Sequence, residues 1–132
     1  MKIQSIYFLV LTLLISVNSF AQDNERKFKI HTLAFYNLEN LFDTINDVNK
    51  NDEASPIMEI KFNRSGIYKQ KIINMAKVIS EIGYGVTKRP PSIIGICEVE
   101  NRKVVEDLIS NEKLKDHNYG IVHYESPDDR GI

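Results

Sequence analysis

An almost unbroken apolar run at residues 92–97 dominates the hydrophobic pattern of the chain. It follows Pro90 and Pro91, which break the preceding element, and reads Ser-Ile-Ile-Gly-Ile-Cys. An apolar run of this length, bounded by breakers, predicts a strand that is buried on both faces. The polarity then inverts at Glu98-Val99-Glu100-Asn101, so this strand is predicted to end in acidic side chains.

Two further stretches have the composition of strands. Residues 28–36 begin with alternating polarity and become continuously apolar, which predicts a strand entering a core. Residues 37–43 follow, where polar side chains are interleaved with large apolar ones. Residues 119–124, Tyr-Gly-Ile-Val-His-Tyr, predict a third strand.

Two segments are predicted to be helices. Apolar residues recur at helical spacing between 66 and 82, and Gly83 and Gly85 follow as stop signals. Asn101 is suited to cap a short helix at residues 102–110. The order strand, loop, helix, strand, helix, strand is an α/β alternation, so the first two strands are expected to be parallel neighbours.

This topology predicts a polar site at the carboxyl ends of the two strands. It brings Asn37 and Glu39 close to Glu98, at the edge of the sheet where open α/β proteins bind their ligands. Two carboxylates and an amide suit one divalent cation, Mg²⁺ or Mn²⁺, with Ca²⁺ also possible. Such an ion acts as a Lewis acid on a phosphate. The simpler alternative is a strand that ends in water with acids and a helix cap.

The acidic loop at residues 46–53 has no sustained period and predicts a solvated connection. A calcium-binding loop is the alternative, but the segment lacks the required glycine and the spacing of the closing glutamate.

The first 21 residues have the pattern of a secretory signal peptide. Lys2 precedes an apolar run at residues 6–17, and small residues at Ser19 and Ala21 favour cleavage after Ala21. An uncleaved anchor is the alternative, although the run is short for a bilayer span. Residues 22–27 form a polar lead-in, and residues 28–132 form the domain portion. We therefore expect an exported protein, periplasmic or extracellular, with no stable membrane insertion after cleavage.

Charge and cysteine content narrow the function classes. The formal net charge is −1, and it becomes −2 without residues 1–21, which carry one lysine and no acid. A general nucleic-acid binder would show a basic excess, so a phosphate substrate would have to be recognised locally, through a metal. Cys97 is the only cysteine, which excludes an internal disulfide, and we interpret it as a small apolar residue of the strand.

Three motifs together resemble the endonuclease/exonuclease/phosphatase family, in particular its secreted bacterial members. They are Phe35–Asp43, Ile94–Asn101 and Ser126–Ile132. The resemblance implies metal-dependent phosphodiester hydrolysis, with Glu98 as the metal-binding glutamate and Asn37 as the asparagine that helps to hold the phosphate and metal. Glu39 falls where some members carry a second acid near the metal.

The implied fold is a four-layer α/β sandwich, two packed mixed sheets flanked by helices, of which this chain would be the N-terminal half. The family's Asp-x-Asn pair and catalytic histidine lie beyond the third motif, and the three histidines here do not match. We therefore expect a truncated, inactive portion of a nuclease-like enzyme, and Arg130 is assigned no catalytic role.

Nucleic acid is the first expectation for the substrate, with lipid head groups and sugar phosphates as alternatives. No oligomeric state is predicted. The alternative function is a non-catalytic secreted α/β module that binds a cation or a partner.

Overall fold

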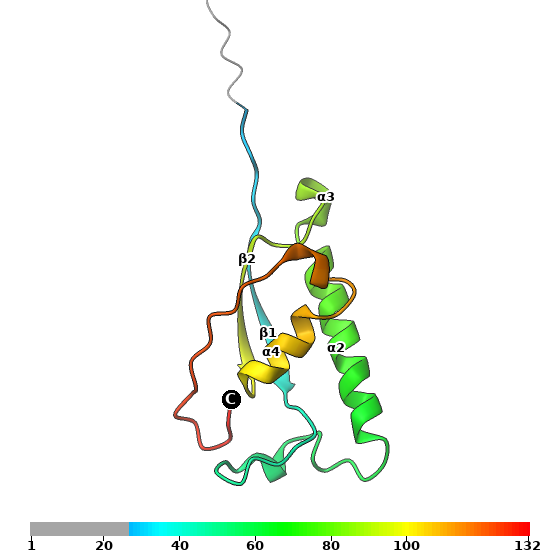
Figure 1. The fold of residues 1–132 in the computed structure, drawn as a ribbon, viewed down its shortest axis with the longest axis vertical. Helices are drawn as coiled ribbons and strands as arrows, with labels where there is room; N and C mark the ends of the chain where they lie inside the picture. Colours follow the sequence, from blue (N-terminus) through cyan, green and yellow to red (C-terminus); the bar gives the residue numbers. More distant parts are fainter. Residues whose placement is uncertain (1–26) are drawn as a thin grey trace, which may run out of the picture.

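The computed structural model describes residues 27–132, which form a small α/β unit with one two-stranded sheet (Figure 1). The predicted signal peptide, and all but Lys27 of the polar lead-in, lie outside these residues. No helix within the described range has the length and apolar character needed to cross a bilayer. The elements in chain order are β1 Leu33–Leu41, the 3₁₀ turn η1 Asp52–Ala54, α2 Arg64–Glu81, α3 Tyr84–Thr87, β2 Ile93–Val99, α4 Arg102–Ile109 and the 3₁₀ turn η2 Lys115–His117.

Strands β1 and β2 are parallel neighbours, as predicted, and they are connected through α2. Their register runs from Leu33 opposite Ile93 to Asn37 opposite Cys97, and it then shifts before Leu41 meets Val99. The first strand occupies different residues from those predicted, because residues 28–32 have no strand partner and β1 continues to Leu41. Asn37 therefore lies within the strand rather than after its end.

The core lies between one face of the sheet and the two longer helices. Helix α2 includes the predicted amphipathic segment up to Glu81, with Ile82 as its C-cap residue. Gly83 follows it as predicted, but Gly85 lies within the short helix α3, so its prediction as a stop is wrong. Helix α4 begins where Asn101 accepts a hydrogen bond from the Val104 backbone N–H (3.0 Å), which confirms the predicted cap. The buried cluster contains Leu38, Leu41, Ile72, Met75, Ala76, Ile79, Val104, Leu108 and Leu114.

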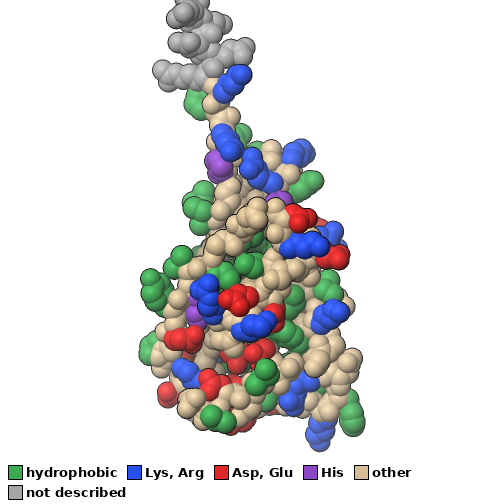
Figure 2. Space-filling view, viewed as in Figure 1, with side chains coloured by type: hydrophobic (Ala, Val, Ile, Leu, Met, Phe, Trp, Pro, Cys, Tyr) green, Lys and Arg blue, Asp and Glu red, His purple; other side chains and the backbone are tan. Residues whose placement is uncertain are grey.

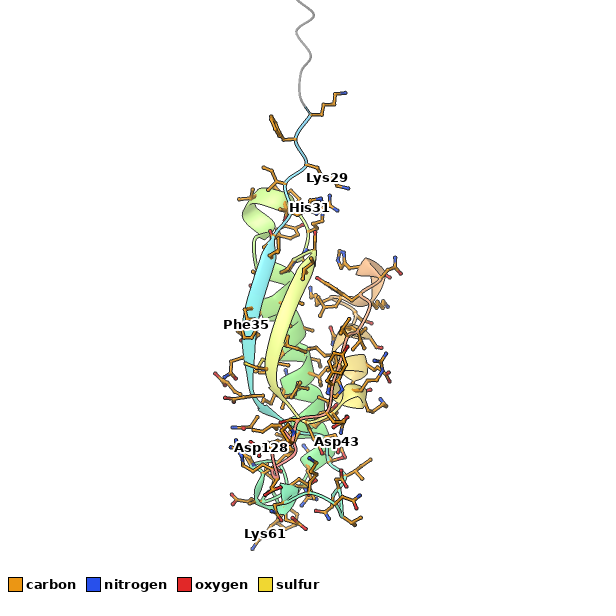
Figure 3. The ribbon with its side chains drawn as sticks, turned by 90° about the vertical axis from the view of Figure 1, so that its left-hand side faces the viewer. Lys29, His31, Phe35, Asp43, Lys61 and Asp128 are labelled. Carbon is orange, nitrogen blue, oxygen red and sulfur yellow. The ribbon has the colours of Figure 1, made fainter. Side chains whose placement is uncertain are left out.

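The opposite face of the sheet is open, so the prediction that β2 is buried on both faces is wrong. Leu33 and Phe35 of β1 are 71% and 76% exposed, and Ile93 of β2 is 63% exposed. Figure 3 looks towards this side, where the two strands lie in front of α2, and Figure 2 shows apolar side chains along one flank of the molecule. An apolar run does not reveal that helices cover only one face.

The predicted third strand is also wrong. Residues 119–124 run beside β2 in Figure 1 but pair with no strand of the described chain. A cavity of about 490 Å³ touches both Ile94 and Ile96 of β2 and residues 119–122. The start of the segment is held instead by the Tyr119 hydroxyl, which donates to the Pro91 carbonyl (2.5 Å). Strand composition is present, but a ladder also requires a partner backbone within hydrogen-bonding distance.

The two faces of β1 predict different responses to truncation in the 132-residue chain. Leu38 is fully buried, so Leu38→Ala should lower the free energy of unfolding by about 2–5 kcal/mol. Phe35 is on the open face, so Phe35→Ala should cost less than about 1 kcal/mol. Urea unfolding followed by circular dichroism measures both. An equal loss in the two variants would show that the Phe35 face is covered in solution.

Candidate functional site at the strand ends

Asn37 and Glu98, which are 61 residues apart in sequence, are in direct contact at the carboxyl-terminal part of the sheet. The Asn37 side-chain amide donates to Oε1 of Glu98 over 2.8 Å. Asn37 lies opposite Cys97, and Glu98 is the next residue of β2. Successive strand residues normally point to opposite faces, but the positive φ of Glu98 (57°) breaks this alternation and lets its carboxylate turn towards Asn37. The structure thus brings together two of the three side chains that sequence analysis placed at the site.

The backbone around these residues adopts a conformation that is uncommon for residues other than glycine. Glu39, Asn40 and Glu98 all have positive φ values, of 54°, 54° and 57°. The Asn40 backbone N–H donates to Oε2 of Glu98 (3.1 Å), and the Glu39 backbone N–H donates to Oδ1 of Asn37 (2.6 Å). Such conformations persist only where surrounding contacts impose them, and they are concentrated at functional sites.

Lys71 of α2 holds the same backbone from the helix side. Its ammonium donates to the carbonyls of Glu39 (2.5 Å) and Asn40 (3.1 Å). Burial lowers the pKa of Lys71, while the carboxylates of Glu39 and Glu98 act in the opposite direction. Sequence analysis missed this residue. Its position immediately before the buried Ile72 was the only indication that its side chain is not fully exposed to solvent.

The third predicted residue, Glu39, contributes its backbone to the site. Its side chain is exposed, and within residues 27–132 its carboxylate has no hydrogen-bond or ion-pair partner. The ligand role of the Glu39 carboxylate remains a prediction.

The histidines lie apart from this contact. His31 is hydrogen-bonded to the Ser92 hydroxyl (2.8 Å) at the opposite end of the sheet, where Figure 3 labels it. His117 lies in η2, and His123 is 3.6 Å from a Glu125 oxygen. None of the three is hydrogen-bonded to Asn37 or Glu98 in the part of the chain that is described.

Arg130 and Asp128, near the end of the chain, form an ion pair. Arg130 pairs with Asp128 (2.8 Å), and Figure 3 shows Asp128 near the same end of the strands as Asp43. Hydrogen bonding to Asp128 raises the pKa of Arg130, and the charge of Glu98 adds to the effect. The hydrogen bonds of the Arg130 side chain among the described residues go to Asp128 and not to Glu98.

A second acidic group lies two residues beyond Glu98. Oε2 of Glu100 accepts a hydrogen bond from the Asp43 backbone N–H (2.6 Å). Burial raises the pKa of Glu100 to about 7; the hydrogen bond from the Asp43 backbone opposes this rise, and the charges of Asp43, Asp52 and Asp47 add to it. Sequence analysis noted Glu100 among the acids after the apolar run but gave it no role.

The Asn37–Glu98 pair fits a cation that keeps most of its water ligands. Each Glu98 oxygen accepts one hydrogen bond, which leaves a lone pair on each for a cation. Within residues 27–132, no three His, Cys, Asp or Glu side chains are grouped so that they could hold a metal ion. A Mg²⁺ ion bound through one or two protein oxygens, several waters and a substrate phosphate is compatible with this limited set.

Comparison with known proteins gives one match. The model of the Endonuclease/Exonuclease/phosphatase family matches residues 32–132, a range that contains all three sequence motifs and the Asn37–Glu98 contact. Comparison with curated proteins and with solved structures finds no match.

The raised pKa of Glu100 predicts a pH-dependent difference between the wild type and Glu100→Gln. Glu100 has an ordinary pKa of 4.5, so between pH 4.5 and about 7 the unfolded chain loses this proton while the folded chain keeps it. Wild-type stability should therefore fall as pH rises through this window, by about 1 kcal/mol after discounting for partial solvation. Glutamine keeps the acceptor for the Asp43 N–H and carries no charge.

Urea unfolding in the presence of EDTA tests this expectation. Glu100→Gln should gain stability relative to wild type between pH 5 and pH 8, and the exposed control Glu81→Gln should show no such change. A difference that is independent of pH would mean that the Glu100 carboxylate is fully solvated.

Proposed function

The chain belongs to the Endonuclease/Exonuclease/phosphatase family, and we propose that it supplies part of a divalent-metal site for phosphodiester hydrolysis. The observation that carries this proposal is the Asn37–Glu98 contact at the strand ends. The family match supports the reaction class, and the contact geometry supports the assignment of Asn37 and Glu98 to the site.

In this reaction, the chain's own residues would bind the divalent cation and orient its ligands. Glu98 would hold Mg²⁺ or Mn²⁺ through its remaining lone pairs, and Asn37 fixes the carboxylate while its amide faces the same edge of the sheet. Lys71 and the Asn40 N–H keep the supporting backbone in place. A divalent ion bound there would polarise a phosphate oxygen and stabilise the leaving oxygen.

Activation of the attacking water requires a general base, and neither Asn37 nor Glu98 is free for this task. No histidine within residues 27–132 contacts the pair. We therefore propose that a group outside the Asn37–Glu98 pair supplies the base.

The open sheet face supports the same proposal. Leu33, Phe35 and Ile93 form an apolar surface that a monomeric domain would normally cover. A second sheet packed on this face would complete the four-layer sandwich, with the described elements as its N-terminal half.

Nucleic acid is the proposed substrate class, and lipid head groups and sugar phosphates are the alternatives. The near-neutral charge favours recognition of a single phosphate through the metal over binding along a basic surface. In Figure 2, basic side chains are interspersed with acidic ones over the face that is shown.

The principal test is Glu98→Gln in the full-length gene product, assayed with a chromogenic phosphodiester and with DNA. The wild type should require Mg²⁺ or Mn²⁺ and lose activity in EDTA. Glu98→Gln should lower kcat/KM by about 100-fold or more, because it removes the charged ligand but keeps an acceptor for the Asn37 amide. Glu39→Gln shows whether the neighbouring acid also binds the metal, and Glu81→Gln is the control.

Full activity in Glu98→Gln would remove this residue from the site. Metal binding by the wild type without hydrolysis of any phosphodiester would favour the non-catalytic cation-binding module.

We also propose that residues 1–21 direct export. When the chain is expressed in a bacterial host, mass spectrometry should find a product that begins at Gln22 outside the cytoplasm. A product that retains Met1 and sediments with membranes would contradict cleavage.

A further inference from the structure

A buried carboxylate lies in the loop that sequence analysis predicted to be solvated. Asp52 is only 2% exposed. Its Oδ2 accepts a hydrogen bond from the Asp47 backbone N–H (2.9 Å), but its Oδ1 has no hydrogen-bond partner among the described residues. A buried charged oxygen without a partner is strongly unfavourable, so this atom requires a ligand.

The surroundings of Asp52 contain a cavity of about 30 Å³. This volume exceeds the roughly 10–15 Å³ that one water molecule requires, so the cavity has room for a water or a monatomic ion. Asp47, Asp52, Glu100 and Glu125 line it, and we call these four residues the Asp52 cluster.

The charge of the Asp52 cluster favours a cation over a water molecule. Four acidic side chains face one basic lining residue, Lys50. The Lys50 ammonium donates to the backbone carbonyls of Ser126 (3.1 Å) and Asp128 (3.0 Å), and within residues 27–132 it forms no ion pair with the cluster. His123, 3.6 Å from Glu125, is the other basic side chain in contact with a member of the cluster.

Two members of the cluster have a carboxylate oxygen that no hydrogen bond among the described residues engages. Oδ1 of Asp52 has no partner, and Glu100 uses only Oε2 in its hydrogen bond with the Asp43 N–H. Oδ1 of Asp47 is already engaged by the backbone and side chain of Asn49 (2.9 and 3.1 Å). The described chain groups no three acids into a ready metal cage, so the remaining ligands would be water and backbone or amide oxygens.

We propose that Asp52 and Glu100 bind a Ca²⁺ ion distinct from the ion at Asn37–Glu98. Ca²⁺ accepts six to eight oxygen ligands in irregular geometry, including carbonyls and waters, whereas Mg²⁺ demands a near-ideal octahedron. The ligands come from separate parts of the chain, unlike those of a contiguous calcium loop.

The ion would join the loop at residues 46–53, the end of β2 and the segment at residues 125–131. The same segments already meet through the Asn51 N–H, which donates to the Asp129 carbonyl (2.8 Å). Binding therefore stabilises the region beside the proposed catalytic site without supplying a group to the reaction.

The test is calcium titration of the full chain by isothermal calorimetry and by thermal unfolding. CaCl₂ should raise the Tm of the wild type, and MgCl₂ should raise it less. The nearly isosteric Asp52→Asn should weaken calcium binding by about tenfold or more, equivalent to at least 1.4 kcal/mol. Asp116→Asn, which alters an exposed acid in η2, should bind as the wild type does.

Glu98→Gln separates this proposal from the proposed function, because it should retain the calcium-dependent rise in Tm. Loss of that rise in Glu98→Gln but not in Asp52→Asn would place the ion at Asn37–Glu98 and overturn the proposal. A wild type whose Tm does not respond to calcium would also overturn it and would indicate a buried water. If Asp52→Asn does not fold, Glu100→Gln takes its place in the titration, with the same expected loss.

Discussion

The parallel pairing of β1 with β2 is the constraint on which the rest of the structure depends. It sets Asn37 opposite Cys97, and the left-handed backbone of Glu98, the next residue of β2, turns the carboxylate against the Asn37 amide. A shift of one residue would move every side chain of the strand to the other face of the sheet. Leu38 would then leave the core and Asn37 would leave the site, so core packing and site assembly select the same register.

Several features near these strand ends lower the stability of the folded chain. Glu39, Asn40 and Glu98 have left-handed backbone conformations, and Glu100 and Asp52 bring acidic side chains into partly or fully buried positions. The apolar cluster between the sheet and helices α2 and α4 offsets these costs. Strain and buried charge gathered at one edge of a sheet are typical of functional regions, since selection for stability alone would remove them.

Local patterns predicted local structure well. The helical period predicted α2, Asn101 predicted the start of α4, and the helical connection between two apolar runs predicted parallel strands that join Asn37 to Glu98. Features that depend on distant partners were not predictable. Residues 119–124 have strand composition but no ladder, and Asp52 is buried in a polar loop because the segment at residues 125–131 lies beside it. Lys71 belongs to the site only because α2 places it over the backbone of residues 39 and 40.

The most direct test of the central claim is paramagnetic line broadening in the ¹⁵N-labelled 132-residue chain titrated with substoichiometric Mn²⁺. If Asn37 and Glu98 form a divalent-metal site, the side-chain amide signals of Asn37 and the backbone amide of Asn40 should be among the first to disappear. EDTA should restore them, and Glu98→Gln should abolish the effect. Sharp Asn37 and Asn40 signals at Mn²⁺ concentrations that broaden other residues would contradict a metal site at these strand ends.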